Sequence, residues 1–596
     1  MSVPQTLPTL EKLGSSLPPD LDIQLVTEKW FAEFAAGLQT IDVDRIVNLF
    51  IDGDIFWRDA LALTWDLRTF RGAPAIKQFL ADQLHIFTIS SATLRKNLVT
   101  LETPFPDIAW IQGFFDFETA VGLATGIFRL VPLADGTWKA HTVYTDLEGL
   151  KGHPELRGPL RDHQPNHGKW AAKRAREVEF LDEEPTVLIV GGGQSGLAVA
   201  ARLKMLGLSA LVVEKHERIG DNWRKRYASL CLNSPVWFQH MPYISFPITW
   251  PVYIPAMKFG DWLESYAHSL ELNVWTSSAV TKIAAGLKKR WSVIVKRQDG
   301  RERVFEVDHV VCALGVGNVP RMPEFSGMNE FQGQILHSSQ YTQGTDYVGR
   351  KVVVIGACNS GHDICGDLAE SGVDVTMYQR NPTYIMSWNK GIPKMLAPLY
   401  WEGGPPTEIA DQIYASYPNP LMSLLQQRTV KEITELDKDL LDGLRARGFK
   451  LLENSAGFLQ LAWSRAGGYY LNFGASDRII DGTIKLKSDS LISHFTSTGL
   501  AFEDGSKMDA DAVILATGFS DARMAYRVLL GDELGSKVSR MGGLDEEGEH
   551  IGLWREVGLP GLWCMTGALL ITRTYSKHVA LQIKAQEEGL FGTRYR

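Results

Sequence analysis

The sequence predicts an α/β protein built on two dinucleotide-binding units, and two observations carry this prediction. An apolar strand runs into a glycine-punctuated turn and a helix at residues 186–196, and the same arrangement returns at residues 351–361. The next strand of each copy ends in a charged residue, Glu214 in the first and Arg380 in the second. Glycines at such a turn let the backbone bend sharply and approach a pyrophosphate, which the free amides of the helix N-terminus then bind.

The two charged residues predict different cofactors. Glu214 lies 23 positions after Gly191 and suits an unmodified ribose, as in FAD. Arg380 lies 24 positions after Gly356 and suits a 2′-phosphate, as in NADPH. The fold class is therefore α/β with two Rossmann-like dinucleotide-binding domains. The residues expected to hold FAD are Gly191, Gly193, Gln194, Ser195, Gly196, Glu214 and Lys215, and those expected to hold NADPH are Gly356, Asn359, Ser360, Gly361 and Arg380.

Helix ends support both units. A glycine-rich turn alone is weak evidence for a nucleotide site, because such turns also serve plain strand-to-helix packing. Here each helix also stops at a suitable distance, at Gly207 in the first copy and at Gly372 in the second. The second copy departs from the pattern at Cys358, which occupies the middle glycine position. Because the backbone approaches the pyrophosphate there, we expect NADPH to sit slightly displaced or to bind less tightly.

The region before the first unit predicts a separate α+β domain. Residues 1–22 contain four prolines and predict a disordered leader. Residues 23–150 begin with apolar residues at helical spacing and continue with alternating, aromatic-rich segments of the strand type. These strands are expected at residues 55–59, 109–117, 126–131 and 138–143. Helices followed by a curved antiparallel sheet resemble the SnoaL-like cone fold.

Four polar or aromatic residues of that domain suggest a cavity. They are Trp57, Arg58, Asp59 and His141. Aromatic and polar strand residues are more often structural, so we leave these four out of the catalytic residues.

Changes in composition set the remaining domain boundaries. Residues 151–183 are rich in charged residues, Pro and Gly, which predicts a linker. The FAD-binding domain is expected at residues 184–340 and 501–596, and the NADPH-binding domain at residues 341–500. Residues 391–500 contain neither glycine motif and are expected to form a partly helical insertion that caps the substrate side.

Bulk composition excludes several kinds of partner. A net charge of −8 without a block of lysine or arginine argues against nucleic acid. The apolar run at residues 562–571 is too short to span a bilayer, and the first residues lack the basic and apolar regions of a signal peptide. We therefore expect a cytoplasmic protein without a membrane span or a metal site. A homodimer is an assembly that the sequence leaves open.

Cysteine usage narrows the reaction class. FAD/NADPH proteins with two dinucleotide domains divide broadly into disulfide reductases and oxygenases. The five cysteines of this chain include no Cys-x-x-Cys pair, which disfavours a disulfide reductase.

A longer motif between the two units is the most specific signal. The segment Phe331-Gln-Gly333-Gln-Ile-Leu-His337-Ser-Ser-Gln-Tyr341 has the pattern F-x-G-x-x-x-H-x-x-x-Y. With it, residues 184–596 resemble the class B flavin-containing monooxygenases. In that family the segment is thought to couple domain movement to NADP handling, so we assign His337 no proton-transfer role.

Other segments share the resemblance and add cofactor contacts. Asn222 and Trp223 stand in the flavin-contacting stretch of the family, while Thr517 and Gly518 stand in its late A-T-G motif. Ala313-Leu314-Gly315 is an imperfect earlier version of the latter. Gly567 and a helix over Thr574–Glu588 resemble the final FAD helix, whose N-terminus can stabilise negative charge on a reduced flavin.

The resemblance also implies a reaction. NADPH reduces FAD, the reduced flavin binds O2 as a C4a-hydroperoxide, and a small organic substrate receives one oxygen atom at a soft nitrogen or sulfur centre. The cofactor supplies the hard chemistry, so no conventional acid/base pair is required. Asn233 aligns with an asparagine that many members place beside the flavin, and it is the catalytic residue expected here. A turn asparagine before Pro235 is its structural alternative.

Three rival functions stay open. Baeyer–Villiger oxygenation of a ketone uses the same scaffold, but Tyr341 stands where that group prefers Trp, and Arg226-Tyr-Ala-Ser lacks its Tyr-Pro-Gly pattern. Oxidative decarboxylation of an arylpyruvate, as in auxin-forming relatives, is a second. The third is a redox-inactive binding protein whose SnoaL-like domain carries the function, an alternative suggested by Cys358 and the extra domain.

Overall fold

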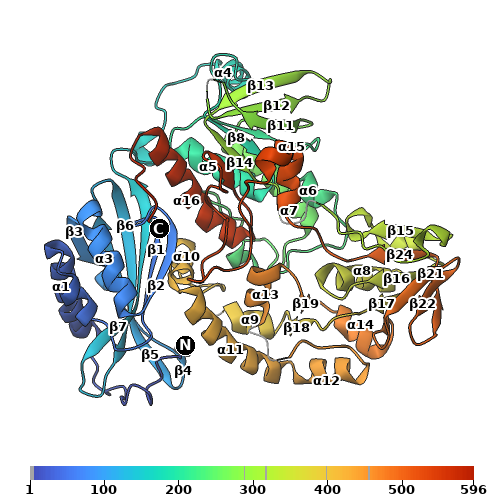
Figure 1. Ribbon diagram of the computed structural model, residues 1–596, viewed down its shortest axis with the longest axis horizontal. Coiled ribbons are helices and arrows are strands. Elements are labelled where there is room, and N and C mark those ends of the chain that lie inside the picture. Colours follow the sequence, from blue (N-terminus) through green and yellow to red (C-terminus); the bar gives the residue numbers. More distant parts are fainter. Residues whose placement is uncertain (1–5, 288, 316–318, 397–398, 454–456, 596) are drawn as a thin grey trace.

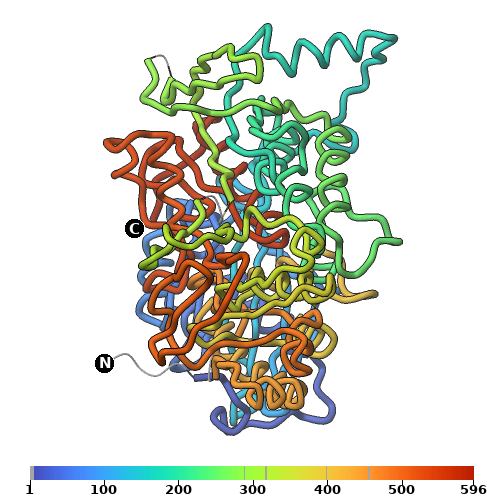
Figure 2. Tube along the Cα trace, turned by 90° about the vertical axis from the view of Figure 1, so that its right-hand side faces the viewer, coloured from blue at the N-terminus to red at the C-terminus, as the bar shows by residue number. Residues whose placement is uncertain are grey.

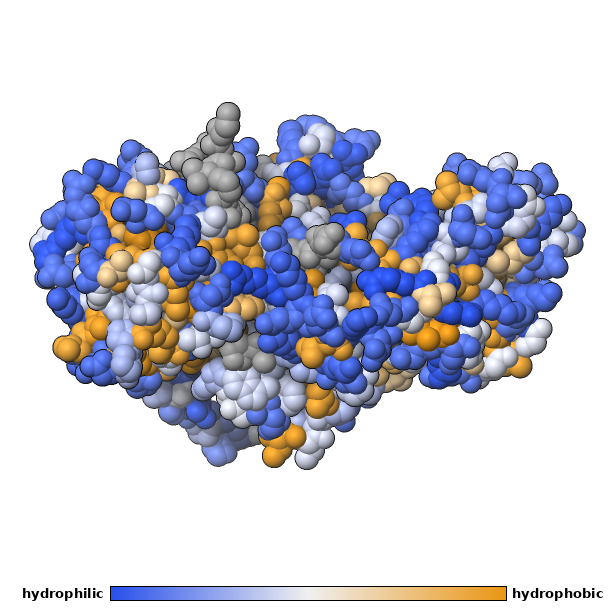
Figure 3. Space-filling model, turned by 90° about the horizontal axis from the view of Figure 1, so that it is seen from below, coloured by the Kyte–Doolittle hydropathy of each residue, from blue (hydrophilic) through white to orange (hydrophobic). Residues whose placement is uncertain are grey.

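A computed structural model describes residues 6–595 except 288, 316–318, 397–398 and 454–456. Figure 1 shows three bodies: an N-terminal sheet with its helices, a first nucleotide unit above the centre, and a second nucleotide unit on the opposite side from the N-terminal sheet. Hydrophilic side chains cover most of the face seen in Figure 3, with hydrophobic side chains in small patches between them. No helix of the described residues is long and apolar enough to cross a membrane.

The N-terminal domain, residues 6–150, is a seven-stranded sheet with helices on one face. Its strands run in the order β2-β1-β7-β6-β5-β3, with β4 also paired to β5. The strands are β1 (Phe56–Ala60), β2 (Leu67–Arg71), β3 (Ser91–Leu94), β4 (Thr100–Phe105), β5 (Ile108–Glu118), β6 (Gly122–Pro132) and β7 (Trp138–Leu150). Helices α1 (Ile23–Thr40) and α3 (Ala73–Phe87) bury aromatic side chains against this sheet, and α2 (Val43–Asn48) buries Ile46. Strands β1, β5, β6 and β7 overlap the four predicted segments.

Residues 6–22 differ from the disordered leader that the prolines predict. Leu7, Leu13, Leu17 and Leu21 pack against the core of the N-terminal domain. The backbone amide of Leu10 donates to the carbonyl of Asp107 at 2.8 Å, which pins the segment to the turn between β4 and β5. The prolines exclude regular secondary structure, but the leucines between them bury enough apolar surface to order the chain. Residues 1–5 lie outside the described residues.

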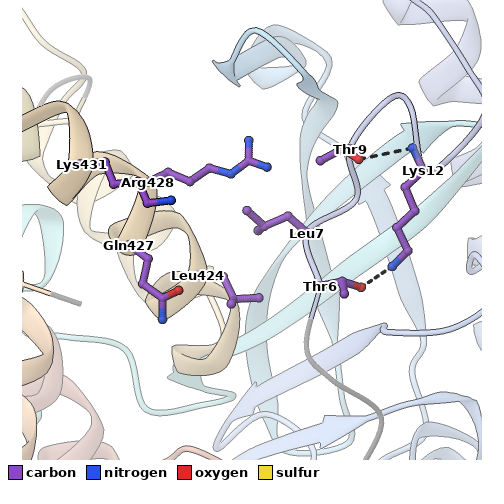
Figure 4. A pocket seen from close by; sticks show the side chains of 8 residues that line it. All are labelled: Thr6, Leu7, Thr9, Lys12, Leu424, Gln427, Arg428 and Lys431. Atoms are coloured by element: carbon purple, nitrogen blue, oxygen red, sulfur yellow. Dashed lines mark hydrogen bonds between the residues drawn. The ribbon is translucent and has the colours of Figure 1, made fainter. Parts of the chain in front are cut away.

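The leader and α11 (Asn419–Leu436) border a solvent-open pocket of about 410 Å³ (Figure 4). Leu7 and Leu424 give it an apolar lining, and Lys12, Arg428 and Lys431 bring positive charge to it. Arg428 also forms an ion pair with Asp107 at 2.6 Å. This pocket lies between the N-terminal domain and the insertion, away from both glycine turns.

The first unit is a five-stranded parallel sheet in the order β10-β9-β8-β14-β25. Its strands are β8 (Val187–Val190), β9 (Ala210–Val213), β10 (Val274–Trp275), β14 (His309–Cys312) and β25 (Leu562–Cys564). Helices α5 (Gln194–Met205), α7 (Ala256–Ser269) and α16 (Leu569–Glu587) accompany it, and β11 (Ala279–Ala285), β12 (Trp291–Lys296) and β13 (Glu302–Val307) form an antiparallel sheet beside it. Because β25 follows the whole second unit in sequence, the first unit closes only at the end of the chain.

The second unit is also a five-stranded parallel sheet, in the order β15-β24-β16-β17-β20. Its strands are β15 (Gln334–His337), β16 (Lys351–Ile355), β17 (Asp374–Tyr378), β20 (Lys485–Lys487) and β24 (Ala512–Leu515). The predicted boundaries at residues 340 and 500 are therefore wrong for two strands, since β15 and β24 join this sheet. Both strands are only four residues long; β24 is apolar throughout, and β15 has apolar residues at its two central positions. Nothing in such a short strand tells which of two parallel sheets it joins.

The helices predicted for an insertion at residues 391–500 lie between residues 391 and 481, whereas β20 at residues 485–487 belongs to the sheet of the second unit. These helices are α9 (Gly391–Leu396), α10 (Thr407–Ser416), α11, α12 (Lys438–Ala446), α13 (Gly457–Arg465) and α14 (Ala475–Asp481). Strand β19 (Tyr469–Asn472) pairs with β18 (Tyr384–Ser387), while β21 (Ile492–Thr496), β22 (Gly499–Phe502) and β23 (Lys507–Asp509) form a small antiparallel sheet. Helix α15 (Arg523–Gly535) then leads back to the first unit.

The polar segment 151–183 connects the N-terminal domain to the first unit. It carries α4 (Trp170–Val178), none of whose residues is buried, and Figure 2 shows it reaching away from the body at the top of the view. Its C-terminal end is anchored, because the Trp275 indole donates to the Val178 carbonyl at 2.8 Å.

Candidate active site

The first glycine turn has the geometry of a pyrophosphate cradle. Gly191 follows β8 with φ +107°, a conformation that side chains other than glycine rarely adopt. A Cβ on Gly196 would lie 2.0 Å from the Gly191 carbonyl oxygen, so only glycine lets α5 approach the strand this closely. The first amides of α5 have no intrahelical partner and can bind an anion. These residues fit a dinucleotide.

Glu214 closes one side of this turn. Its carboxylate is 6% exposed and accepts hydrogen bonds from the amides of Gly192, at 2.7 Å, and His216, at 2.8 Å. Each oxygen keeps a lone pair, so the side chain can still accept from a ribose hydroxyl. The neighbouring Lys215 is exposed. The sequence did not predict the roles of Gly192 and His216, because both donate through the backbone amide, which nearly every residue type has.

Helix α6 (Asp221–Arg224) places two predicted residues on the same turn. The amide nitrogen of Asn222 lies 3.1 Å from the position that a Cβ on Gly193 would take. The Trp223 indole donates to Oε1 of Gln194 at 3.1 Å. The structure therefore brings the flavin-contacting stretch onto the first glycine turn.

The N-terminus of α16 completes the first site. This helix begins at Leu569 rather than at the expected Thr574, and Gly567 before it has φ +141°. The Ser195 and Thr572 hydroxyls lie 3.1 Å apart, which sets the first turn of α16 beside the first turn of α5. Two helix N-termini thus converge, and both favour negative charge. Thr572 was missed because no pattern links it to a turn far away in sequence.

The second glycine turn repeats the first. Gly356 has φ +129°, and a Cβ on Gly361 would lie 2.0 Å from the Gly356 carbonyl oxygen. Helix α8 (Asn359–Glu370) begins there, and the Asn359 side chain accepts from the Leu471 amide at 3.2 Å. Ser360 stands beside Asn359 in this first turn and is half-buried. The residues fit a second dinucleotide.

Cys358 makes the difference between the turns. Burial raises the pKa of its thiol. Displacement or weaker binding of NADPH at this position stays a prediction.

Arg380 lies two residues beyond the end of β17 and is exposed. Its carbonyl accepts from the Lys450 ammonium at 3.3 Å. Its guanidinium forms no ion pair with any of the described residues, in contrast to the enclosed carboxylate of Glu214. The second site thus presents an open positive charge where the first presents a buried negative one.

Thr517 and Gly518 belong to the second unit, which corrects their expected place in the FAD-binding domain. The carbonyl oxygen of the preceding residue, Ala516, lies 2.3 Å from the position that a Cβ on Gly356 would take. The Thr517 hydroxyl donates to the Arg321 carbonyl at 2.6 Å. In the first unit the carbonyl oxygen of Ala313 has the corresponding position, 2.5 Å from where a Cβ on Gly191 would lie. The late and early motifs are thus equivalent turns in different units.

The motif ahead of the second unit holds this unit together. The His337 ring contacts the Gly518 carbonyl through Nε2 at 2.9 Å and the Ser339 hydroxyl through Nδ1 at 2.9 Å. Burial lowers its pKa. The Tyr341 hydroxyl donates to Asp367 on α8 at 2.6 Å. Both ring nitrogens of His337 are engaged, which agrees with a positioning role.

Asn233 lies in the loop that follows α6. The backbone before it is held by a 2.8 Å hydrogen bond from the Leu232 amide to the Ile254 carbonyl. Asn233 itself is half-buried, and its side chain makes no hydrogen bond within the described part of the chain. Its amide is therefore available to a ligand.

The N-terminal domain presents its predicted cavity residues on both faces of the sheet. Asp59 faces the helices, where it is fully buried and accepts from the Thr64 hydroxyl at 2.7 Å and from Thr145. Burial raises its pKa to about 7. Trp57 donates to the same Thr145, at 3.1 Å, and His141 is buried with its pKa lowered by burial to about 4.

Arg58 points the other way, toward the flavoprotein part. Its guanidinium binds Glu549 with Nε–Oε1 at 2.7 Å and Nη2–Oε2 at 2.9 Å, and Nη2 also lies 3.2 Å from the Tyr575 hydroxyl on α16. Nearby, His578 and Lys577 of α16 contact Asp146 of β7 at 2.6 and 3.0 Å. The contacts of Arg58 with Tyr575 and of Asp146 with Lys577 and His578 join the N-terminal domain to α16, the helix that begins beside the first glycine turn.

The chain is similar to several known proteins. A family profile described as pyridine nucleotide-disulphide oxidoreductase matches residues 188–437. The indole-3-pyruvate monooxygenase YUCCA1 of Oryza sativa subsp. japonica is 30% identical over 340 residues, which cover 56% of this chain and 77% of that protein. The probable indole-3-pyruvate monooxygenase YUCCA4 of Arabidopsis thaliana is 30% identical over 344 residues, covering 56% and 75%.

Among solved structures, a flavin-containing monooxygenase from Stenotrophomonas maltophilia aligns with a TM-score of 0.45 and 21% identity, over 67% of this chain and 98% of that one. The family profile spans both glycine turns and the motif between them, and both turns have the geometry of a dinucleotide cradle. The chain therefore belongs to the flavin-containing monooxygenase family and is an NADPH-dependent flavin oxidoreductase with FAD and NADPH as its cofactors.

Proposed function

We propose that this protein inserts one oxygen atom of O2 into a small organic substrate at a soft nitrogen or sulfur centre. One observation carries the proposal: the chain places two equivalent glycine cradles in one molecule, one beside a buried carboxylate and one near an exposed guanidinium. Such a pair matches one FAD and one NADPH. Family membership favours this enzyme over the redox-inactive binding protein.

In this proposal Gly191, Gly193 and Gly196 admit the FAD pyrophosphate, and Glu214 accepts from the ribose. When bound, the flavin supplies the redox chemistry and the activation of O2. The converging first turns of α5 and α16 favour negative charge at the cofactor. Asn222, Trp223, Gln194 and Ser195 are held to one another and to α16 by the contacts described above, so the cradle is ordered by the protein itself.

On the NADPH side, Gly356, Asn359, Ser360 and Gly361 form the cradle. Arg380 pairs with the 2′-phosphate by charge-assisted hydrogen bonds. Thr517 and Gly518 support this second turn rather than the first.

Asn233 is the proposed catalytic residue. Its side chain is half-buried and unbonded within the described residues, on the loop that leaves the flavin-contacting helix α6. A neutral amide there can hydrogen-bond a substrate or the reacting oxygen without supplying a proton that would discharge the activated flavin. The soft-centre assignment rests on Tyr341, which replaces the tryptophan of the Baeyer–Villiger signature.

We also propose that residues 23–150 form a SnoaL-like domain with a supporting rather than a catalytic task. Of its predicted cavity residues, Trp57 and Asp59 are engaged by hydrogen bonds with Thr145, and Arg58 is engaged by Glu549 and by Tyr575 of α16. One continuous cluster of buried apolar residues joins α1, β1 and β7 to α5 and α16. The domain thus stabilises α16 through this apolar interface.

The relatives favour one second candidate, oxygenation of an arylpyruvate with loss of its carboxyl group, since two of them are named indole-3-pyruvate monooxygenases. A substrate panel separates the candidates. The purified holoenzyme with NADPH and air is offered a tertiary amine, a thioether, a cyclic ketone and an arylpyruvate. An N-oxide or sulfoxide as main product supports the proposal, whereas an ester or an arylacetate as main product replaces it.

A further inference from the structure

The short segment from Asn222 to Tyr227 connects the first glycine turn to α8, the helix that begins at the second glycine turn. Its beginning belongs to α6, where Asn222 lies against Gly193 and Trp223 donates to Gln194 at 3.1 Å. Both partners are in the first glycine turn. This end of the segment is therefore fixed by the FAD site.

The other end is fixed by the second unit. Tyr227 is 4% exposed and its ring belongs to the buried apolar core of that unit rather than to the first. Its hydroxyl donates to the Asp363 carboxylate at 2.7 Å. The next amide, of Ala228, donates to the Thr342 carbonyl at 2.9 Å. The six residues Asn222–Tyr227 thus cross from one unit to the other and are held at both ends.

Asp363 links this contact to the NADPH turn. It lies in the second turn of α8, the helix whose first residues, Asn359, Ser360 and Gly361, form the second cradle. Burial raises the pKa of Asp363 to about 6, against the lowering effect of the Tyr227 hydrogen bond and the Arg226 charge. A carboxylate that is costly to bury needs its donor, so the position of α8 depends on Tyr227.

We propose that the Asn222–Tyr227 segment couples the two cofactor sites, so that binding of one cofactor strengthens binding of the other. This inference rests on the cofactor sites proposed above. FAD seated on Gly193 fixes α6, which fixes Tyr227 and through Asp363 the start of α8. The same chain of contacts runs in reverse when NADP⁺ orders α8. Tyr227 is a positioning residue in this scheme and touches neither cofactor.

Linkage makes the proposal measurable without catalysis. The Kd of FAD for the flavin-free protein is measured by flavin fluorescence with and without saturating NADP⁺, and the ratio of the two values is the coupling factor. The Kd of NADP⁺ with and without FAD must give the same factor, because coupling is reciprocal. We expect a factor of about five or more, the lower end of measured couplings.

The Tyr227→Phe variant should bring the factor close to one while leaving the Kd of FAD alone nearly unchanged. Tyr341→Phe is a matched control, because it also removes a hydrogen bond from a tyrosine to an aspartate of α8, at 2.6 Å. Tyr341 lies outside the Asn222–Tyr227 segment, so this hydrogen bond does not connect the two units. The Tyr341→Phe variant should keep the coupling factor. From the helix side, Asp363→Asn keeps an acceptor and should retain coupling, whereas Asp363→Ala should lose it.

Three results overturn the inference: a factor of one in the unmodified protein, an unchanged factor in both Tyr227→Phe and Asp363→Ala, or an equal loss in Tyr341→Phe. If Tyr227→Phe does not fold, the comparison of Asp363→Asn with Asp363→Ala decides whether the segment couples the two sites. Failure of either cofactor to bind at all contradicts the cofactor sites themselves, and is distinguished from failure of the coupling, where both bind independently.

Discussion

Replacing Arg58 by methionine tests whether the N-terminal domain stabilises α16, the helix whose N-terminus lies beside the first glycine turn. The change removes the partner of Glu549, whose side chain has no solvent exposure, and the donor to the Tyr575 hydroxyl and the Ala415 carbonyl. Removing one partner of a buried ion pair costs about 3–5 kcal/mol, because the other charge stays buried. The additional unbonded carbonyl and hydroxyl place Arg58→Met toward the upper part of that range.

The effect is measured locally, because a chain of several domains does not unfold in one step. Hydrogen–deuterium exchange of the α16 amides reports the opening of the interface, and flavin release on mild denaturation reports its consequence. Arg58→Met should speed both. The double variant Arg58→Met/Glu549→Met removes both charges and should restore most of the protection, since a buried pair replaced by apolar residues is often neutral.

The pH dependence gives a second readout with a definite sign. Burial raises the pKa of Glu549, but the Arg58 charge and the hydrogen bonds from Arg58 and Thr69 bring it from 4.5 down to about 2. A lowered pKa stabilises the folded protein above 4.5, and this contribution is lost as the pH falls toward 2. The unmodified protein should therefore lose its advantage over Arg58→Met within this window. Equal exchange rates in both proteins at neutral pH, or a double variant no better than the single one, would refute the interface as described.

Three further variants test the cofactor and substrate sites. Gly193→Val should purify without flavin, because even a Cβ there lies 3.1 Å from the Asn222 amide nitrogen; full flavin content measured by absorbance would contradict the placement of FAD. Arg380→Ala should lose most of the preference for NADPH over NADH, since each charge-assisted hydrogen bond to the phosphate contributes about 1.5–3 kcal/mol; stopped-flow reduction with both nicotinamides measures it, and an unchanged ratio speaks against Arg380. Asn233→Ala should keep flavin reduction but lower product formation about a hundredfold, with hydrogen peroxide released instead; unchanged coupling of NADPH use to product would make Asn233 a turn residue only.

Local patterns in the sequence predict most of the structure around the two glycine turns. The steric need for glycine at Gly191, Gly196, Gly356 and Gly361 is local, so spacing alone predicts it. The helix stops at Gly207 and Gly372 are confirmed, with φ +72° and +74°. Strand-like alternation likewise locates β1, β5, β6 and β7.

Non-local pairing accounts for what the sequence does not predict. Strands β15 and β24 join the sheet of the second unit although both lie in segments predicted for the FAD-binding domain. A four-residue strand contains no information on which strand it pairs with. The leader orders through leucines whose partners are in another part of the domain. The contacts of Glu214 with the Gly192 amide, of Ser195 with Thr572, and of Tyr227 with Asp363 each join residues distant in sequence, and no local period reveals them.

Oxygen-isotope labelling tests the central claim most directly. The holoenzyme is incubated with NADPH, a thioether or tertiary amine, and ¹⁸O2 in ordinary water, and the product is analysed by mass spectrometry. The account predicts that one heavy oxygen atom appears in the sulfoxide or N-oxide, and that product formed equals NADPH consumed. Product oxygen drawn from water, or NADPH oxidation that yields only hydrogen peroxide across the whole panel of substrates, would contradict it.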